Sequence, residues 1–183
     1  SLVAPINGCW IDGTFGAGGY TRALLQNGAG KVLAIDKDSS TNVFLKNIQN
    51  EYGDMISFYN QNFADMQENN DITCRDDICG VVLDLGVSSM HLDNPLRGFS
   101  FKESGPLDMR MGNQPGPTAS EIINLCSEAT LADLIFFYGQ ERKARKIANK
   151  IVQERNKRKI NTTLELAEII RAIVPKNSKK DPA

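Results

Sequence analysis

A glycine-rich segment near the start of the chain has the residue types that bring a backbone close to a ligand. It reads Asp12-Gly13-Thr14-Phe15-Gly16-Ala17-Gly18-Gly19 and lies between an apolar run that ends at Ile11 and a helical pattern that begins near Tyr20. Glycines allow a tight turn, and the helix that follows directs free N–H groups into the same crevice. The spacing matches neither a dinucleotide fingerprint nor a P-loop, because Thr21 replaces the last glycine of the first and Gly19-Tyr20 replaces the Lys-Ser/Thr of the second.

Three aspartates close apolar runs of the strand type: Asp12, Asp36 and Asp84. Asp36 follows Gly16 by about 20 residues, where a carboxylate can accept hydrogen bonds from both ribose hydroxyls of an adenosine. Three acids at one sheet edge repel, and a cationic ligand relieves them, so the pattern favours S-adenosylmethionine over anionic NAD. Two alternatives stay open: a NAD-dependent oxidoreductase, and a glycine-rich turn beside a surface aspartate.

The elements that must position these residues alternate between strands and helices over the first hundred residues. We expect strands over 9–12, 31–36, 56–59 and 78–84, a helix over 20–26, a helix capped by Ser39 or Ser40, a short helix over 62–68 and a polar loop over 69–77. Nearly continuous apolar strands that alternate with helices predict a parallel, doubly wound α/β sheet. Such sheets usually have more than four strands, so we expect the chain to be a fragment whose later strands follow the helical region.

The second half of the chain has a different pattern. Residues 85–117 are rich in Gly, Pro and Ser without periodicity, which predicts a long functional loop. Helices follow, and we expect them over 130–139, 140–159 and 164–174, the last stopped by Pro175. Capping boxes are predicted at Thr118/Glu121, Thr130/Asp133 and Thr162/Glu165. We therefore expect a partial α/β core over 1–112, an inserted helical domain over 113–176 and a tail over 177–183.

Composition narrows the function classes. The net charge of the 183 residues is −1, but residues 1–100 hold six basic against twelve acidic side chains, and residues 101–183 hold fifteen against ten. Nine of those basic residues fall within 142–159, which hints at a surface that binds a polyanion. Four scattered cysteines and a single histidine argue against a zinc site or a disulfide framework, and no membrane span or secretory signal is visible.

Five motifs, taken together, identify a family. These are the glycine segment of residues 12–19, Leu83-Asp84-Leu85-Gly86-Val87-Ser88-Ser89, Arg97-Gly98-Phe99-Ser100-Phe101, Gly105-Pro106-Leu107-Asp108-Met109-Arg110-Met111 and Tyr138-Gly139-Gln140-Glu141-Arg142. They closely resemble the small-subunit (16S) ribosomal RNA cytosine-N4 methyltransferases of the RsmH/MraW type. The resemblance implies a Rossmann-like core with an inserted helical domain, S-adenosylmethionine as the methyl donor, and a decoding-centre cytidine of 16S rRNA in the small ribosomal subunit as the substrate.

The resemblance also implies site residues. Cofactor contacts fall on Gly18, Gly19, Tyr20, Asp36, Phe63, Asp84 and His91, and Gly16 of the same loop joins them. Three positions depart from the usual pattern: Tyr20 stands for His, His91 for Gln, and Leu96 for an acid. Of these, His91 puts a contact in doubt, because its reach and charge state differ from those of Gln.

Cytosine N4 is a poor nucleophile, so a hydrogen-bond acceptor for its N–H would set the attacking geometry and receive the proton. Asp84 is the first hypothesis for this acceptor and Asp108 the second. A C5-methyltransferase would need a nucleophilic cysteine near the loop, and Cys79 lies at the wrong end of its strand.

The remaining candidates concern the RNA. Phe99 and Phe101 could stack on a flipped cytosine or anchor the loop, and Arg97 and Arg110 could contact phosphate or pair with Asp93 and Asp108. Arg142, Lys143 and Lys146 belong to a helix face predicted to follow phosphates, whereas Ile135, Phe136 and Phe137 are expected in the helical core. A non-catalytic RNA-binding or ribosome-assembly factor is the alternative function. The oligomeric state, monomer or homodimer, is left open, and we expect a cytoplasmic location, or the mitochondrial matrix for an organellar relative.

Overall fold

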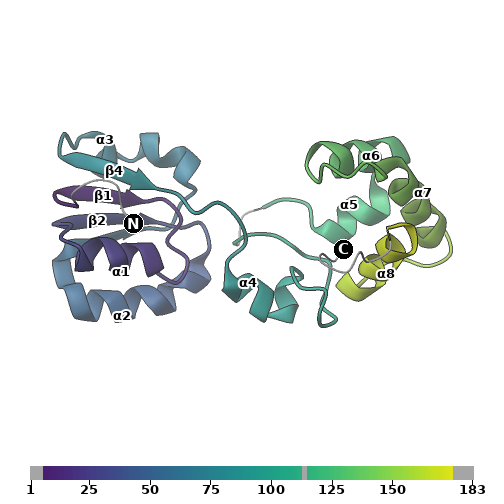
Figure 1. The fold of residues 1–183 in the computed structure, drawn as a ribbon, viewed down its shortest axis with the longest axis horizontal. Helices are drawn as coiled ribbons and strands as arrows, with labels where there is room; N and C mark the ends of the chain where they lie inside the picture. The colour runs from purple at the N-terminus through teal and green to yellow at the C-terminus, as the bar shows by residue number, and fades with distance from the viewer. Residues whose placement is uncertain (1–5, 113–114, 175–183) are drawn as a thin grey trace. The chain divides into compact units, whose positions relative to one another are not determined.

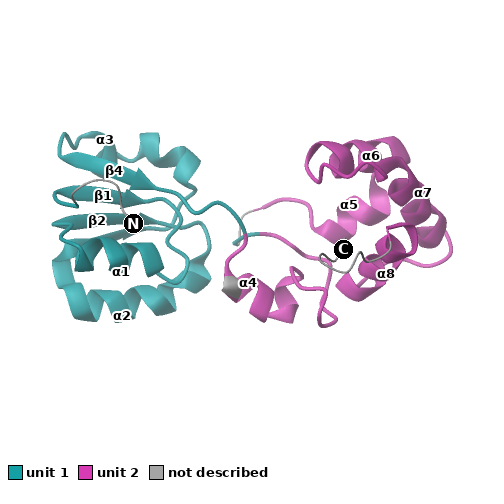
Figure 2. Cartoon of the chain, viewed as in Figure 1, with its two compact units in different colours: residues 1–86, 111–114 teal, residues 87–110, 115–183 magenta. Residues whose placement is uncertain are grey.

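The structure, a computed structural model, describes residues 6–112 and 115–174, apart from the side chain of Ser89. The chain forms two compact units, one within residues 1–86 and 111–114 and the other within residues 87–110 and 115–183 (Figure 2). The division expected from the sequence at residue 112 differs from this one, because residues 87–110 belong to the second unit.

The first unit is built on a parallel sheet with the strand order β3-β2-β1-β4. The strands are β1 (Cys9–Asp12), β2 (Lys31–Ile35), β3 (Ile56–Tyr59) and β4 (Ile78–Val82). Asp12 pairs with Ala34 of β2 and with Val82 of β4, so the strands end at a common edge. The predicted parallel sheet is confirmed, and the three strand-end acids fall at this edge or just beyond it.

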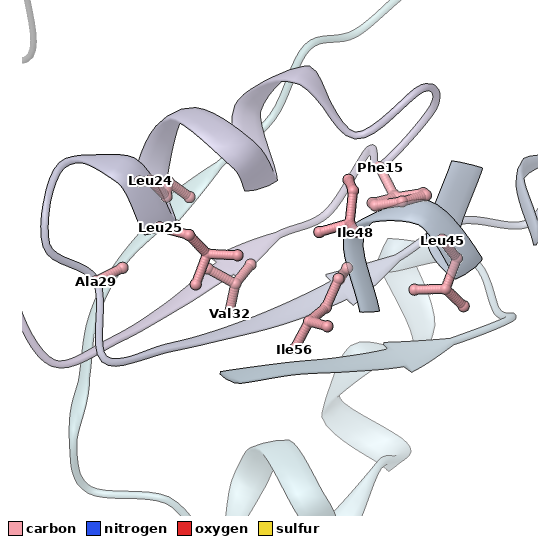
Figure 3. Close-up of a cluster of buried hydrophobic side chains, with 9 residues drawn as sticks. Phe15, Leu24, Leu25, Ala29, Val32, Leu45, Ile48 and Ile56 are labelled. Carbon is pink, nitrogen blue, oxygen red and sulfur yellow. The ribbon is translucent and has the colours of Figure 1, made fainter. Parts of the chain in front are cut away.

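Helices cover both faces of the sheet (Figure 1). On one face, α1 (Gly19–Gln26) and α2 (Asn42–Tyr52) bury Leu24, Leu25, Leu45 and Ile48 against Val32 and Ile56 (Figure 3). On the other face, the 3-10 segment η3 (Phe63–Glu68) and α3 (Asn70–Thr73) cover Cys9, Ile11, Leu33 and Ile35, and Ile72 of α3 is buried in the same cluster. Both faces of β2 are buried, which explains why its sequence is apolar without alternation.

Two local expectations for this unit are corrected. Asp38, rather than Ser39 or Ser40, caps the segment before α2: its side chain accepts from Ser40 N–H and opens the 3-10 turn η1 (Ser39–Thr41). The predicted polar loop over 69–77 contains α3, because the Asn69 side chain accepts from Asp71 N–H and caps a single helical turn. A further 3-10 turn, η2 (Gly53–Met55), follows α2.

The second unit packs four helices on one core: α5 (Ala119–Leu125), α6 (Glu128–Phe137), α7 (Ala144–Arg155) and α8 (Thr163–Ile173). The buried stripe of α7 is Ala144, Ile147, Ala148 and Ile151, as its spacing predicts. Leu131 and Ile160 pack against it, and Leu107 joins the same core from the preceding loop. The predicted helix over 140–159 is wrong at both ends, since α7 is the shorter element.

The expected structureless loop over 85–117 is also corrected, because it contains α4 (Ser89–Asp93) and the 3-10 turn η4 (Pro95–Arg97). The loop is held on the helical core, since Thr163 N–H donates to Gly105 O at 2.9 Å and Gly105 N–H donates to Thr163 Oγ1 at 3.2 Å. A Cβ on Gly105 would lie 1.9 Å from Pro95 O, so only glycine allows this close crossing of the two segments of the loop.

Two of the three predicted capping boxes are confirmed, at Thr118/Glu121 and Thr162/Glu165. The third is wrong: α6 begins one turn earlier, and the Ser127 side chain accepts from Thr130 N–H. Gly139 does not adopt the left-handed conformation that often ends a helix. The positive φ lies one residue later, at Gln140. The expected stop at Pro175 lies outside the described residues.

Because Ser127 rather than Thr130 caps α6, removing the two hydroxyls should affect stability unequally. Ser127→Ala should lower the free energy of unfolding by about 1 kcal/mol, because the N-cap acceptor of α6 is lost. Thr130→Ala should cost less, since Thr130 provides a backbone donor that alanine keeps. Urea unfolding of the two variants measures the difference, and a larger loss for Thr130→Ala would contradict the assignment.

Candidate functional site at the strand ends

The glycine segment is held by the buried carboxylate of Asp12. One oxygen of Asp12 accepts from Thr14 N–H at 3.2 Å, and the other accepts from the Thr21 hydroxyl at 2.7 Å. Gly18 has φ +78°, and a Cβ there would lie 2.2 Å from Cδ1 of Ile48, so this position requires glycine. Gly19 differs, since a Cβ added there would meet nothing within 4 Å, and the N-cap residue of α1, Gly18, has no side chain that could cap the helix. The loop therefore leaves open space at the start of α1.

Asp36 ties the glycine loop to the end of β2. Its carboxylate accepts from Gly16 N–H at 2.7 Å and from Asp38 N–H at 2.9 Å. The side chain is half-buried, so it stays open to a ligand at the strand end. Gly16 has φ +52° and only one atom near its Cβ position, which keeps the backbone accessible at this point. The structure thus brings Gly16 and Asp36, two of the predicted cofactor residues, together.

Asp84 is connected to the same loop. Its backbone N–H donates to the Thr14 hydroxyl at 2.7 Å, while Gly13 N–H donates to Val82 O at 3.0 Å. A chain of hydrogen bonds thus connects Thr21, Asp12, Thr14 and Asp84. Thr14 and Asp84 are 70 residues apart in the sequence. The Asp84 side chain is exposed at the sheet edge. Sequence reasoning missed Thr14, because a threonine inside a glycine motif carries no signal of its own.

Gly112 is a second residue that the sequence did not single out. It has φ +80°, and a Cβ there would lie 2.6 Å from Lys37 O and 3.4 Å from Asp38 Cα. The chain therefore returns to the first unit against the turn that holds Asp36. Phe63, by contrast, is among the predicted residues, and its Cβ lies 3.3 Å from a Cβ built on Gly13. Tyr20 lies at the start of α1 and is about half exposed.

The buried Asp12 gives a testable pH dependence. Burial raises the pKa of its carboxyl above the usual 3.8, and the hydrogen bonds from Thr21 and Thr14 offset part of that rise. Because the folded-state pKa exceeds the unfolded-state pKa, the stabilising contribution is greatest below 3.8 and is lost as pH rises through the folded-state pKa. Relative to Asp12→Asn, the unchanged chain should gain free energy of unfolding as pH falls from neutral. Urea unfolding at several pH values checks this, and a pH-independent difference would refute it.

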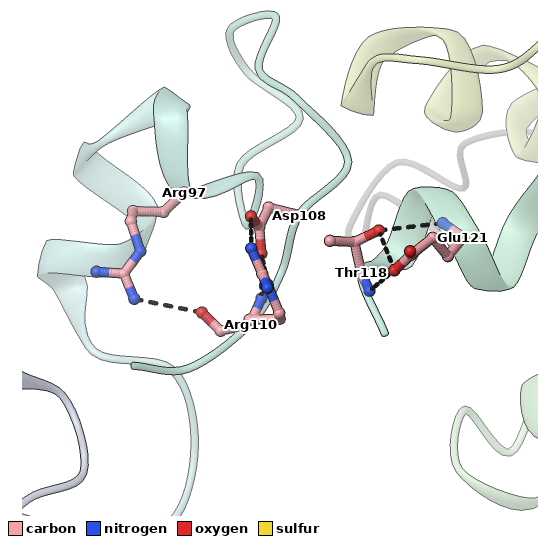
Figure 4. Close-up of polar contacts among 5 residues, drawn as sticks. All are labelled: Arg97, Asp108, Arg110, Thr118 and Glu121. Carbon is pink, nitrogen blue, oxygen red and sulfur yellow. Dashed lines mark hydrogen bonds and ion pairs between the residues drawn. The ribbon is translucent and has the colours of Figure 1, made fainter. Parts of the chain in front are cut away.

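In the second unit, Arg110 and Asp108 form a bidentate salt bridge (Figure 4). Arg110 Nε and Nη2 donate to the two Asp108 oxygens at 2.7 and 2.8 Å, and this pairing lowers the pKa of the Asp108 carboxyl. Arg97 donates to Arg110 O at 3.3 Å, and a Cβ on Gly98 would lie 2.2 Å from Pro106 O. Of the two sequence interpretations of Arg110, the structure shows the pairing with Asp108.

Comparisons with known proteins agree with this geometry. The MraW methylase family model matches residues 2–183. The chain belongs to this family. The parallel sheet and its flanking helices are accordingly a Rossmann-like methyltransferase core, as predicted, and the resemblance found in the sequence is confirmed.

Relatives named "Ribosomal RNA small subunit methyltransferase H" cover most of the chain. The protein from Cereibacter sphaeroides is 46% identical over 176 residues, which are 96% of this chain and 52% of that protein. The Ruegeria protein is 48% identical over the same shares, and the Wolbachia protein is 44% identical over 100% of this chain and 63% of its own. The chain thus spans about half the length of most of these relatives.

The remaining candidates for a MraW family site lie in the second unit. His91 is 8% exposed, its Nδ1 lies 3.3 Å from Ser88 N, and its ring centroid lies 5.0 Å from that of Phe99. Phe101 is half-buried and lies under the guanidinium of Arg171 at 5.4 Å. Phe99 and Phe101 each have a partner within this unit, which is consistent with anchoring the loop.

The basic residues of the family member fall into two groups. Lys150 and Lys157 pair with Glu154, and Arg158 pairs with Glu165. Arg142, Lys143 and Lys146 are exposed at the start of α7. No group of three His, Cys, Asp or Glu residues in the described ranges could hold a metal ion, and none of the described helices is long and apolar enough to cross a membrane.

Proposed function

We propose that this chain carries the donor site of an enzyme that methylates N4 of a decoding-centre cytidine in 16S ribosomal RNA, with S-adenosylmethionine as the donor. The observation that carries the proposal is the connected edge of the sheet, where Asp36 holds the glycine loop and Thr14 of that loop holds Asp84. Membership of the MraW methylase family and relatives named as small-subunit ribosomal RNA methyltransferases support the reaction class.

The residues at this edge fit the proposed cofactor. Gly16, Gly18, Gly19 and Tyr20 form the loop and the start of α1, where a Cβ built on Gly19 would meet nothing within 4 Å. Asp36 is placed to accept hydrogen bonds from ribose hydroxyls, and Phe63 provides an apolar surface beside Gly13. When bound, S-adenosylmethionine supplies an electrophilic methyl group on a sulfonium. The acidic edge favours that positive charge over a dinucleotide pyrophosphate.

Asp84 is our proposal for the acceptor of the cytosine N4 proton. Its carboxylate is exposed, and its backbone is fixed by Thr14, so its position is defined without its side-chain oxygens being consumed. Asp108, the second hypothesis, is less suited, because Arg110 occupies both of its oxygens and lowers its pKa. A carboxylate with a lowered pKa is a weaker proton acceptor. His91 as a further cofactor contact, and Arg97, Phe99 and Phe101 as RNA contacts, stay proposals for the loop over 87–110.

Two measurements test the function. Calorimetric titration with S-adenosylmethionine and, separately, NADH decides the cofactor, and binding of NADH alone would overturn the proposal. Small ribosomal subunits incubated with the chain and labelled donor are then digested, and nucleoside mass spectrometry locates the label. N4-methylcytidine is the expected product. A label on cytosine C5, or RNA binding that ignores the donor, would point to another reaction or to a non-catalytic factor.

Arg142, Lys143 and Lys146 are our proposal for contacts to RNA phosphates. Each contact with single-stranded RNA releases counterions, so Lys146→Gln should reduce the slope of log Kd against log salt by about 0.7. Lys150→Gln is the matched control, because Glu154 already neutralises Lys150 at 2.7 Å. Fluorescence anisotropy over a salt series measures both slopes. An equal slope change for the two variants would contradict the assignment.

A further inference from the structure

The C-terminal end of α6 presents three consecutive aromatic side chains to solvent. Phe136, Phe137 and Tyr138 are 52%, 70% and 85% exposed, which overturns the expectation that the two phenylalanines lie in the helical core. The Phe136 and Phe137 rings contact each other, with centroids 5.4 Å apart and an edge-on angle of 76°. An exposed cluster of large apolar groups is the informative exception on a protein surface, because it usually marks a binding site.

Packing within the unit does not explain these rings. α6 is apolar on nearly all sides, and it uses Leu131, which is buried, and Ile135, one turn later, to pack against α7. Helical geometry then directs the next two side chains away from that face. The helical core therefore forms without these rings, and their exposure calls for another explanation.

Basic residues follow the three aromatic residues closely in the sequence. A short connection joins α6 to α7, with Gly139 N–H and Glu141 N–H both donating to Ile135 O, so Arg142, Arg145 and Lys146 stay near the end of α6. All three are exposed and form no ion pair with any described residue. The Glu141 carboxylate accepts from Lys143 N–H at 2.7 Å at the start of α7, and the first turn of this helix has no further acid. The three cations exceed this single carboxylate, so the cluster keeps a net positive charge that favours an anionic partner.

We propose that Phe137 and Tyr138 stack on the bases of an unpaired RNA segment while Arg142, Arg145 and Lys146 contact its phosphates. We call these five residues the stacking surface. Aromatic rings beside basic groups are how proteins bind single-stranded nucleic acid, whereas a duplex hides its base faces. A second copy of the chain fits less well, because a two-fold contact would bring the same cations together. The choice of RNA rests on the proposed function, but the surface is separate from the donor site.

The test compares one RNA strand in two states. The probe is a fluorescein-labelled, mixed-sequence single-stranded RNA, alone or annealed to its complement, and anisotropy gives both affinities for the full chain. The double variant Phe137→Ser with Tyr138→Ser should lose about tenfold or more of its affinity for the single strand, and little for the duplex. Leu125→Ser is the matched control, since Leu125 is 78% exposed at the end of α5 and lies outside the stacking surface.

Three results would overturn the proposal. The first is unchanged affinity of the double variant for the single strand, and the second is an equal loss for both RNA states. The third is a dimer of the unchanged chain, by sedimentation, that the double variant dissociates without loss of RNA affinity. A failure of the proposed function is distinct, because it shows as lost donor binding or missing N4-methylcytidine while ring-dependent binding of the single strand persists.

Discussion

Asp36→Ala is expected to weaken the binding of S-adenosylmethionine by about 100-fold or more. The carboxylate accepts two backbone N–H groups, from Gly16 at 2.7 Å and from Asp38 at 2.9 Å, and it is the proposed acceptor for the ribose hydroxyls. Hydrogen bonds to charged groups contribute about 1.5–3 kcal/mol each, and every 1.4 kcal/mol is about tenfold in affinity. The variant therefore loses both the ligand contacts and the constraint on the loop.

The matched control for this prediction is Asp54→Ala. It removes the same charge from an exposed side chain on η2, outside the proposed site. Asp36→Asn should fall between the two, because the amide keeps one oxygen that can accept a backbone N–H but has lost the charge. Calorimetry of the four proteins gives the affinities. If Asp36→Ala binds the donor as tightly as Asp54→Ala does, Asp36 is not a cofactor residue.

The second large effect is expected at Asp84. Asp84→Asn should lower the rate of methyl transfer by about 10²–10⁴-fold, because the amide no longer accepts the proton of cytosine N4 in the transition state. The affinity for the donor should fall far less than the rate. Single-turnover methylation of small subunits measures the rate, and calorimetry measures the affinity. If the variant methylates at the unchanged rate, a group other than the Asp84 carboxylate accepts the proton.

Thr14 separates a positioning effect from a chemical one. Its hydroxyl accepts from Asp84 N–H at 2.7 Å, so Thr14→Val should lower kcat, whereas Thr14→Ser keeps the hydroxyl and should restore it. A purely structural role predicts instead that the serine variant is impaired as much as the valine variant. The pair of substitutions thus reports on the connection between the glycine loop and the proposed acceptor.

The sequence predicts the regular elements of this fold better than their ends. The apolar run of β2 identifies a strand that is buried on both faces. The equally apolar β4 is a parallel strand too, but it lies at the edge of the sheet with Cys79 and Val81 exposed. The caps are less certain, since several short polar residues compete at each helix start: Asp38 rather than Ser39 or Ser40, and Ser127 rather than Thr130. Helices as short as α3 and α4 contain too few residues for a periodic signal.

The candidate site could likewise be predicted only in part. Gly16 and Asp36 can be placed at the same sheet edge from the sequence, because each follows a strand of one β-α-β segment. The contact between Thr14 and Asp84 spans 70 residues and requires the strand order β1-β4, which the sequence does not state. The core prediction for Phe136 and Phe137 is wrong for another reason: an apolar helix such as α6 has no polar face to indicate which side meets solvent.

The packing of Gly112 against Lys37 has a consequence for how the chain is made. Residues 87–110 belong to the second unit, yet the next residues return to the first and complete the turn that carries Asp36. During synthesis the four described strands can pair as soon as β4 has emerged, but the turn that carries Asp36 lacks its contact with Gly112 until residues 87–110 have been translated. We therefore expect the sheet to form before the turn at Asp36 is complete.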